Sequence, residues 1–302
     1  MNRILFLLLA LLISLSAALP MLSADVAYEV LLVTAHPDDE TAMAGTIYNI
    51  THKLHGHVDL CVITDGEGGF QHSSLASSLY GLNLSDESVS RANLARIRKQ
   101  ELRNAGKILG IRELTFLEQK DTGYALDEDA VLKGAQWDLP FIKRRLQELM
   151  HKTHYDFVFC LLPAANVHAH HKAASILALD AVQELPNNER PAVLGCSELS
   201  ADSPHSIAYT QLKNHPETSV ENSKPEFKFD RRMPVPEDSS LNYQIVANWA
   251  IAEHKTQGSL QGCMNRTNIE QYWFFSINRL AALERCRALF SAINAPAAET
   301  AK

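Results

Sequence analysis

Short, almost wholly apolar runs alternate with segments of helical periodicity along the first two thirds of this 302-residue chain. A strand that is apolar at every position is buried on both faces of its sheet, and helical crossovers between parallel strands cover those faces. The alternation therefore predicts an α/β fold with a mostly parallel sheet. The expected strands are residues 28–35, 58–64, 114–117, 157–162 and 192–196.

Helices on both faces of that sheet complete a Rossmann-like architecture in a single domain. They are expected at residues 41–55, 92–109, 139–152, 171–185 and 241–254. The polar segment 210–240 indicates a loop and edge-strand excursion, and the Ser-rich segment 70–90 indicates a loop. We place the domain at residues 25–291 and expect a frayed tail at 292–302. Ligands of such sheets bind at the carboxyl ends of the strands.

Residues 1–24 have the pattern of a secretory signal peptide. A positive region with Arg3 precedes the apolar run 4–15, and Leu22-Ser23-Ala24 forms a small-residue cleavage site. Cleavage after Ala18 is one alternative. An uncleaved membrane anchor is another, although the apolar run is short for a membrane span of about 20 residues. We expect an exported protein, periplasmic or extracellular, with no membrane span after cleavage of the leader.

Composition narrows the possible partners and the type of metal site. The 28 Lys and Arg residues against 35 Asp and Glu give a net charge of −7, so the chain lacks the basic excess of a nucleic-acid binder. The 5 cysteines lie far apart in the sequence and form no thiolate zinc motif, whereas the chain has 13 histidines. Any metal would therefore be held by histidine and carboxylate.

The segment Ala35-His36-Pro37-Asp38-Asp39-Glu40 follows the first expected strand, where a ligand site belongs. Pro37 has a fixed φ and keeps His36 out of helical geometry, so the turn is stiff. Adjacent carboxylates in one turn point in different directions, and a cation would relieve their repulsion. An ordinary acidic helix N-cap is the alternative interpretation.

A second cluster, Asn166-Val167-His168-Ala169-His170-His171, follows the expected strand 157–162 and begins the next helix. His168 and His171 are three residues apart and share a face on a helical turn. Three imidazoles in four residues are hard to explain as core packing, although a merely polar loop would also accommodate them. Because both clusters follow the carboxyl ends of apolar strands, a shared site is favoured.

These segments resemble a known family. Ala35–Glu40 is similar to the AHPDDE signature of the PIG-L/LmbE-like family of zinc-dependent N-acetyl-sugar deacetylases, and His168–His171 is similar to its HPDH element. Ala169 and His170 stand where that element has proline and aspartate. Weaker similarities to the family lie at residues 64–67, 98–110, 120–123 and 252–257, so the resemblance covers about residues 28 to 258.

The resemblance implies a zinc ion held by His36, Asp39 and His171, with Fe²⁺ or another divalent metal as the alternative. Asp38 would be the general base, and His168 would stabilise the oxyanion or protonate the leaving amine. The implied reaction is metal-dependent removal of acetyl from an N-acetylglucosamine-type sugar or glycoconjugate. Zinc with three protein ligands suits that reaction, because it lowers the pKa of a bound water to about 7.

The resemblance also implies that Arg98 and Asp121 contact hydroxyl groups of the substrate. Two other hypotheses stay open. A non-catalytic metal- or glycan-binding protein on the same scaffold is suggested by His170 at the aspartate position. A Mg²⁺-dependent phosphoester hydrolase ranks last, because imidazole ligands suit zinc better than Mg²⁺.

Overall fold

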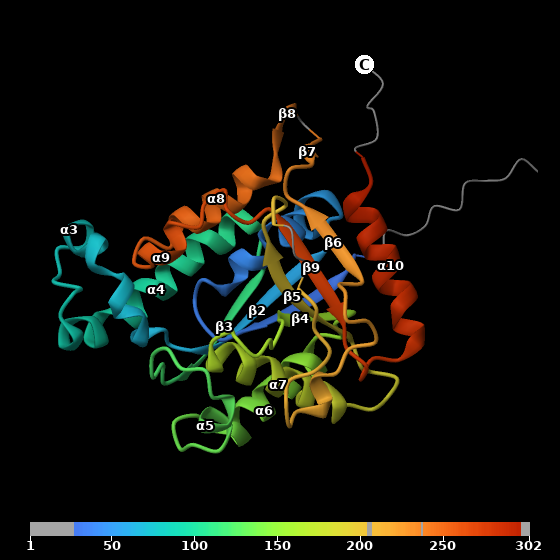
Figure 1. Ribbon diagram of the computed structural model, residues 1–302, viewed down its shortest axis with the longest axis horizontal. Helices are drawn as coiled ribbons and strands as arrows, with labels where there is room; N and C mark the ends of the chain where they lie inside the picture. The colour runs from blue at the N-terminus through green and yellow to red at the C-terminus, as the bar shows by residue number, and fades with distance from the viewer. Residues whose placement is uncertain (1–26, 204–206, 237, 297–302) are drawn as a thin grey trace, which may run out of the picture.

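A seven-stranded sheet forms the middle of the molecule in this computed structural model, which describes residues 27–203, 207–236 and 238–296 (Figure 1). The strand order is β3-β2-β1-β4-β5-β9-β6. The strands are β1 (Glu29–Thr34), β2 (His57–Thr64), β3 (Glu113–Gln119), β4 (Phe157–Leu161), β5 (Ala192–Leu199), β6 (Phe227–Asp230) and β9 (Ile269–Phe274). Every pairing among β1 to β5 is parallel, which confirms the mostly parallel α/β fold.

The strand order reverses direction beside β1. The chain passes from β1 to β2 and β3 on one side, then crosses back to place β4 and β5 on the other side. The segments that follow β1 and β4 therefore leave neighbouring strand ends in different directions, and a crevice opens between them. The antiparallel strand β9 joins β5 to the edge strand β6 and completes the sheet.

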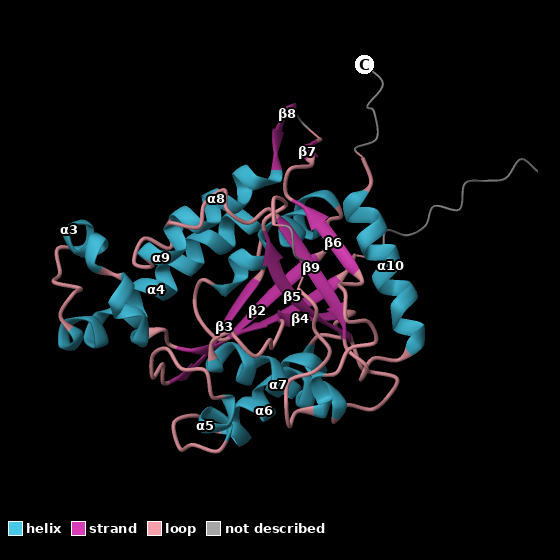
Figure 2. Cartoon of the chain, in the orientation of Figure 1, coloured by secondary structure: helices cyan, strands magenta, loops and turns pink. Residues whose placement is uncertain are grey.

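Helices cover both faces of the sheet, as Figure 2 shows. Side chains alternate between the faces along β1, so Val30 and Leu32 join one core and Leu31 and Val33 the other. The first core is covered by α2 (Ala44–Tyr48), α4 (Glu87–Leu109), α8 (Tyr243–Glu253) and α10 (Leu280–Asn294). The second is covered by α5 (Glu128–Leu132), α6 (Leu139–Lys152) and α7 (Ala169–Gln183).

Two segments before α4 differ from their sequence prediction. The expected helix 41–55 is divided into a 3₁₀ turn η1 (Asp39–Met43), α2 and a π-helical turn η2 (Asn49–Lys53). The expected loop 70–90 contains short helical turns, namely η3 (Glu67–His72), η4 (Ser74–Ala76) and α3 (Ser77–Tyr80). Helix α4 begins at Glu87, earlier than expected, because the Asp86 carboxylate accepts a hydrogen bond from the Val89 N–H.

The last third of the chain holds the predicted edge excursion, followed by elements that sequence periodicity did not predict. The segment 210–240 holds η5 (Pro216–Thr218), the edge strand β6 and the hairpin β7 (Pro234–Val235) and β8 (Asp238–Asn242), in agreement with an edge excursion. Strand β9, α9 (Gly258–Gln261) and α10 follow. The tail expected from residue 292 is wrong for its first residues, because α10 continues to Asn294 and Ile293 is fully buried.

The predicted leader, residues 1–24, lies outside the described residues. Among the residues that are described, none of the helices combines the length and the apolar character needed to cross a bilayer.

Candidate metal and active site

A cleft of about 450 Å³ opens at the carboxyl ends of β1, β4 and β5. Its walls come from the turn after β1, the start of α7, the middle of α4 and the loop after β3. All seven residues that the sequence predicted for the site line this cleft: His36, Asp38, Asp39, Arg98, Asp121, His168 and His171. The fold therefore brings the two clusters together.

Asp39 holds the turn that follows β1. Its Oδ2 accepts hydrogen bonds from the main-chain N–H groups of Ala35 (3.0 Å) and His36 (2.9 Å). Its other oxygen, Oδ1, lies 3.2 Å from His171 Nε2. Burial alone would raise the pKa of Asp39, but the neighbouring His171 and His36 outweigh it and hold that pKa well below its ordinary value. Asp39 is therefore a carboxylate with one oxygen directed into the cleft.

Three atoms of His36, Asp39 and His171 form a compact set of donors. His36 Nδ1 lies 3.0 Å from His171 Nε2 and 3.8 Å from Asp39 Oδ1, and the third distance is the 3.2 Å given above. Tetrahedral zinc with bonds of about 2.0–2.2 Å places its ligand atoms about 3.3 Å apart. These residues therefore fit a zinc-like divalent ion, with a histidine-carboxylate donor set that leaves a fourth position open.

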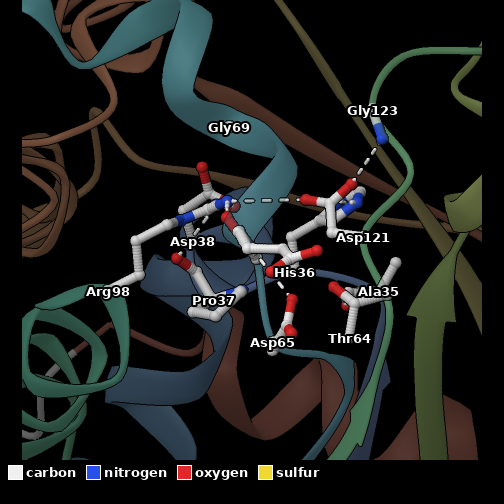
Figure 3. Close-up of polar contacts among 12 residues, drawn as sticks. Ala35, His36, Pro37, Asp38, Thr64, Asp65, Gly69, Arg98, Asp121 and Gly123 are labelled. Carbon is white, nitrogen blue, oxygen red and sulfur yellow. Dashed lines mark hydrogen bonds and ion pairs between the residues drawn. The ribbon is translucent and has the colours of Figure 1, made fainter. Parts of the chain in front are cut away.

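Asp38 lies beside this donor set and forms an ion pair with Arg98. The Asp38 Oδ1 and Arg98 Nη2 atoms are 2.9 Å apart, and Arg98 Nη1 donates to the main-chain oxygen of Gly66 at 2.8 Å. Figure 3 shows Arg98 reaching from α4 toward Asp38 and Asp121, whose Oδ2 is 3.9 Å away. The buried Arg98 side chain thus fixes the Asp38 carboxylate in the cleft wall.

A glycine-rich turn after β2 lets this wall close. Gly66 has φ of +74°, a left-handed conformation that glycine adopts without strain. A Cβ atom on Gly68 would lie 2.4 Å from Asp121 Oδ1, so a side chain there would push Asp121 out of place. Asp121 itself is held by the main-chain N–H of Gly123, which donates to its Oδ1 at 2.9 Å.

His168 is the N-cap of α7, which determines its tautomer. Its Nδ1 accepts a hydrogen bond from the main-chain N–H of His170 at 2.9 Å, so the proton of the neutral ring belongs on Nε2. Burial, followed by the charges of His36 and His171, lowers the pKa of His168 to about 4. The cap therefore leaves one N–H donor on a ring that lines the cleft.

His170 is a residue of the site that sequence reasoning missed. Its ring is 1% exposed, and its Nδ1 lies 3.1 Å from His36 Nε2. Burial, followed by the charge of His36, lowers the pKa of His170 to about 3. Nitrogen atoms of His36, His168 and His170 also lie within 4.8 Å of one another. The available signal was its place inside the histidine cluster, next to two residues that were assigned to the site.

A buried ion pair lies behind the cleft. His254 Nε2 is 2.6 Å from Glu40 Oε1, and both side chains are fully buried. Burial alone would lower the pKa of His254, but the Glu40 carboxylate outweighs it and raises that pKa. The last acid of the Ala35–Glu40 segment is therefore held by the segment 252–257, which the sequence singled out only weakly.

Strand β9 also supports the turn after β1. The Glu270 carboxylate accepts main-chain hydrogen bonds from Gly45 (2.7 Å) and Thr46 (2.9 Å), which lie in the first turn of α2. Arg231 donates to Glu270 at 2.7 Å and to the main-chain oxygen of Thr41 at 2.6 Å. A helix N-terminus favours such a negative charge, so the network fixes the start of the helical segment after the motif.

Comparison with known proteins finds a matching family and similar sequences. The profile of the family described as PIG-L, GlcNAc-PI de-N-acetylase, matches residues 31–182, which is half of the chain. A Bacillus anthracis protein, "Probable N-acetyl-alpha-D-glucosaminyl L-malate deacetylase 2", is 28% identical over 164 residues. That match covers 54% of this chain and 62% of the relative, so the chain spans less than two thirds of that protein's length.

Solved structures share the fold at low sequence identity. The hydratase GalB of Pseudomonas putida KT2440, which acts on 4-carboxy-2-hydroxymuconate, has a TM-score of 0.50 at 15% identity, covering 84% of this chain and 98% of its own. The N,N'-diacetylchitobiose deacetylase of Pyrococcus horikoshii has a TM-score of 0.49 at 20% identity, covering 82% and 83%. Because a hydratase has this fold, the fold alone does not determine the reaction.

Proposed function

This chain belongs to the PIG-L family, and from that membership we propose that it hydrolyses the acetamide of an N-acetylglucosamine-type sugar or glycoconjugate. The observation that carries the proposal is the convergence of His36, Asp39 and His171 at one point, with Asp38 beside them in the same cleft. A donor set next to an independent carboxylate is the arrangement that metal-assisted amide hydrolysis needs.

Zinc is the proposed metal, and Fe²⁺ or another divalent ion is the alternative. His36, Asp39 and His171 would hold it. When bound, such an ion supplies Lewis acidity toward the acyl oxygen and lowers the pKa of a water molecule. Asp39 is suited to this role because its Oδ2 is already occupied by two main-chain N–H groups, so only Oδ1 is available to a cation.

Asp38 and His168 have complementary roles in the proposed reaction. Asp38 accepts a proton from the attacking water, whose oxygen adds to the acetyl carbon. His168 donates its Nε2–H as a hydrogen bond to the oxygen that gains negative charge, and the proton that Asp38 took from the water goes to the departing nitrogen, directly or through His168. The C–N bond then breaks, and the products are acetate and a free amine. Arg98 keeps Asp38 directed at the cleft through the 2.9 Å ion pair.

Substrate recognition is proposed to involve Arg98 and Asp121 as hydroxyl-binding groups, because both line the cleft. A volume of about 450 Å³ is in the range of small-molecule sites and suits one or two sugar rings. We also propose, from the sequence of residues 1–24 alone, that the protein is exported. An exported enzyme would act on envelope or extracellular glycans.

An acetate-release screen tests the proposal. Purified protein, analysed for bound metal, would be incubated with a panel of N-acetylglucosaminides that differ in their aglycone. We expect acetate and free amine in equal amounts from at least one member, and loss of both after chelation. Glycan binding without any acetate release would contradict the proposal and favour the binding-protein alternative.

A further inference from the structure

The outer nitrogen of His36 has an unusual neighbour. A histidine that binds a metal through one ring nitrogen almost always donates the N–H of its other nitrogen to a carboxylate, a main-chain carbonyl or a water. In this protein His36 Nδ1 is one of the three atoms of the donor set, so Nε2 is the outer nitrogen. Within the described part of the chain, the group at hydrogen-bond distance from Nε2 is the Nδ1 atom of His170, at 3.1 Å.

The nearby carboxylate is too far away to take this role. Asp121 Oδ2 lies 3.9 Å from His36 Nε2, beyond the length of an N–H···O hydrogen bond. Asp121 Oδ1 is instead engaged by the main-chain N–H of Gly123. The distances therefore assign the support of His36 to an imidazole rather than to a carboxylate.

We propose that His170 is a positioning residue that holds His36 in its metal-binding orientation. If His36 keeps the lone pair of Nδ1 for the metal, its proton is on Nε2, and His170 Nδ1 must accept it. The proton of His170 then belongs on its own Nε2, which lies 3.0 Å from Thr122 Oγ1. This assigns one consistent set of donors and acceptors from Thr122 through His170 to His36.

The surroundings hold the His170 ring in place. It is 1% exposed, and the Trp137 ring lies with its centre 5.1 Å from the centre of the imidazole. The Trp137 indole N–H donates to the main-chain oxygen of Lys120, so the loop that carries Thr122 and the ring of His170 share one support. His170 itself is in the first turn of α7, directly before the proposed ligand His171.

The inference rests on the metal site of the proposed function, so its test reads metal affinity directly. The dissociation constant for Zn²⁺ would be measured by competition with a chromogenic chelator in the wild type and in two variants of matched size. His170→Leu removes the acceptor and keeps the bulk. His170→Asn keeps an amide group near the position of Nδ1. His151→Asn, at an exposed histidine, is the control.

We expect His170→Leu to weaken Zn²⁺ binding about 10- to 100-fold, the range for loss of a group that orients a metal ligand. His170→Asn should recover most of that loss, and Thr122→Val should give a smaller loss than His170→Leu. Thermal unfolding of the metal-free proteins controls for packing, since a residue that only packs would alter stability without a difference in affinity between Leu and Asn.

Three results would overturn the inference. Equal Zn²⁺ affinity in the wild type and His170→Leu would show that His36 needs no support from His170. Equal losses in the Leu and Asn variants would indicate packing. Binding of two Zn²⁺ ions by the wild type and one by His170→Leu would make His170 a ligand of a second ion. A wild type that binds no metal would instead contradict the proposed metal site itself.

Discussion

Two cavities of nearly equal size lie at opposite ends of the sheet, about 450 Å³ at the carboxyl ends and about 440 Å³ at the amino ends of β4 and β5. The first receives the start of α7, from which His168 and His171 line the cavity. The second receives its end, near Val182. Their volumes do not distinguish them, but their chemistry does.

Asp156 and Asn278, two polar residues of the amino-end cavity, are bonded to main-chain groups of the sheet. Asp156 accepts a hydrogen bond from the Glu29 N–H at 3.1 Å and lies 3.6 Å from Arg285, and Asn278 pairs with both main-chain groups of Val193 at 2.7 Å. Among the described residues, the two sets of three side chains that could hold a metal ion are both at the carboxyl-end cleft and share His36. Convergence of buried titratable groups, and not cavity size, therefore distinguishes the end where we propose that the reaction takes place.

Substitution of His36 should give the largest difference in metal affinity and activity between the two ends of the sheet. His36→Ala removes a ligand, so Zn²⁺ affinity should fall more than about 100-fold, beyond the loss caused by groups that only orient a ligand. Acetate release should fall below detection. Elemental analysis of the purified variant checks the first result. His154→Ala, at an exposed histidine of the amino-end cavity, is the matched control and should keep both metal and activity.

Asp38→Asn separates metal binding from proton transfer in the cleft. The amide keeps the shape of the side chain but cannot accept the proton of the attacking water. We expect kcat to fall on the order of 10²–10⁴-fold with the metal content unchanged. Steady-state kinetics on the best substrate of the acetate screen provides the measurement, and full activity would exclude Asp38 as the general base.

The buried pair behind the cleft should matter for stability. His254→Leu leaves the Glu40 carboxylate fully buried without its partner, so the free energy of unfolding should fall by about 3–5 kcal/mol. Urea unfolding followed by circular dichroism measures the change. Adding Glu40→Leu should restore part of the loss, because the double variant has no unpaired charge; no restoration would contradict this explanation.

The ion pair in the amino-end cavity, Arg285 with Asp156, should contribute least to the free energy of unfolding. Arg285 and Asp156 are 3.6 Å apart and both are partly exposed, so solvent screens their attraction. We expect Arg285→Ala to change the free energy of unfolding by less than about 0.5 kcal/mol and to leave acetate release unchanged. The same unfolding assay applies, and a loss as large as that of His254→Leu would remove the contrast between the two ends.

The sequence predicted the parallel sheet and the meeting of the two clusters because these depend on local patterns. Apolar strands and helix periodicity are local, and the rule that ligands bind at carboxyl strand ends then places the clusters at one edge. The bounds of α6 were also predictable, since Asp138 and Pro140 mark its start.

The remaining features depend on contacts between distant segments. The pairing of His254 with Glu40 and of Glu270 with α2 joins residues more than 200 positions apart, and no local pattern encodes such partners. His170 was missed for a different reason. Helical spacing groups residues three or four apart, but His36 lies between two successive side chains of the first turn of α7, with Nε2 toward His170 and Nδ1 toward His171.

The support that β9 and α8 give to the turn after β1 has a consequence for modularity. The family profile ends at residue 182, yet Glu40 and the N-terminal turn of α2 are held by Glu270 and His254, which come later. A fragment ending at Val182 would keep every proposed metal ligand and lose these partners. The recognisable half of the sequence is therefore not a separable unit, and the proposed chemistry belongs to the complete sheet.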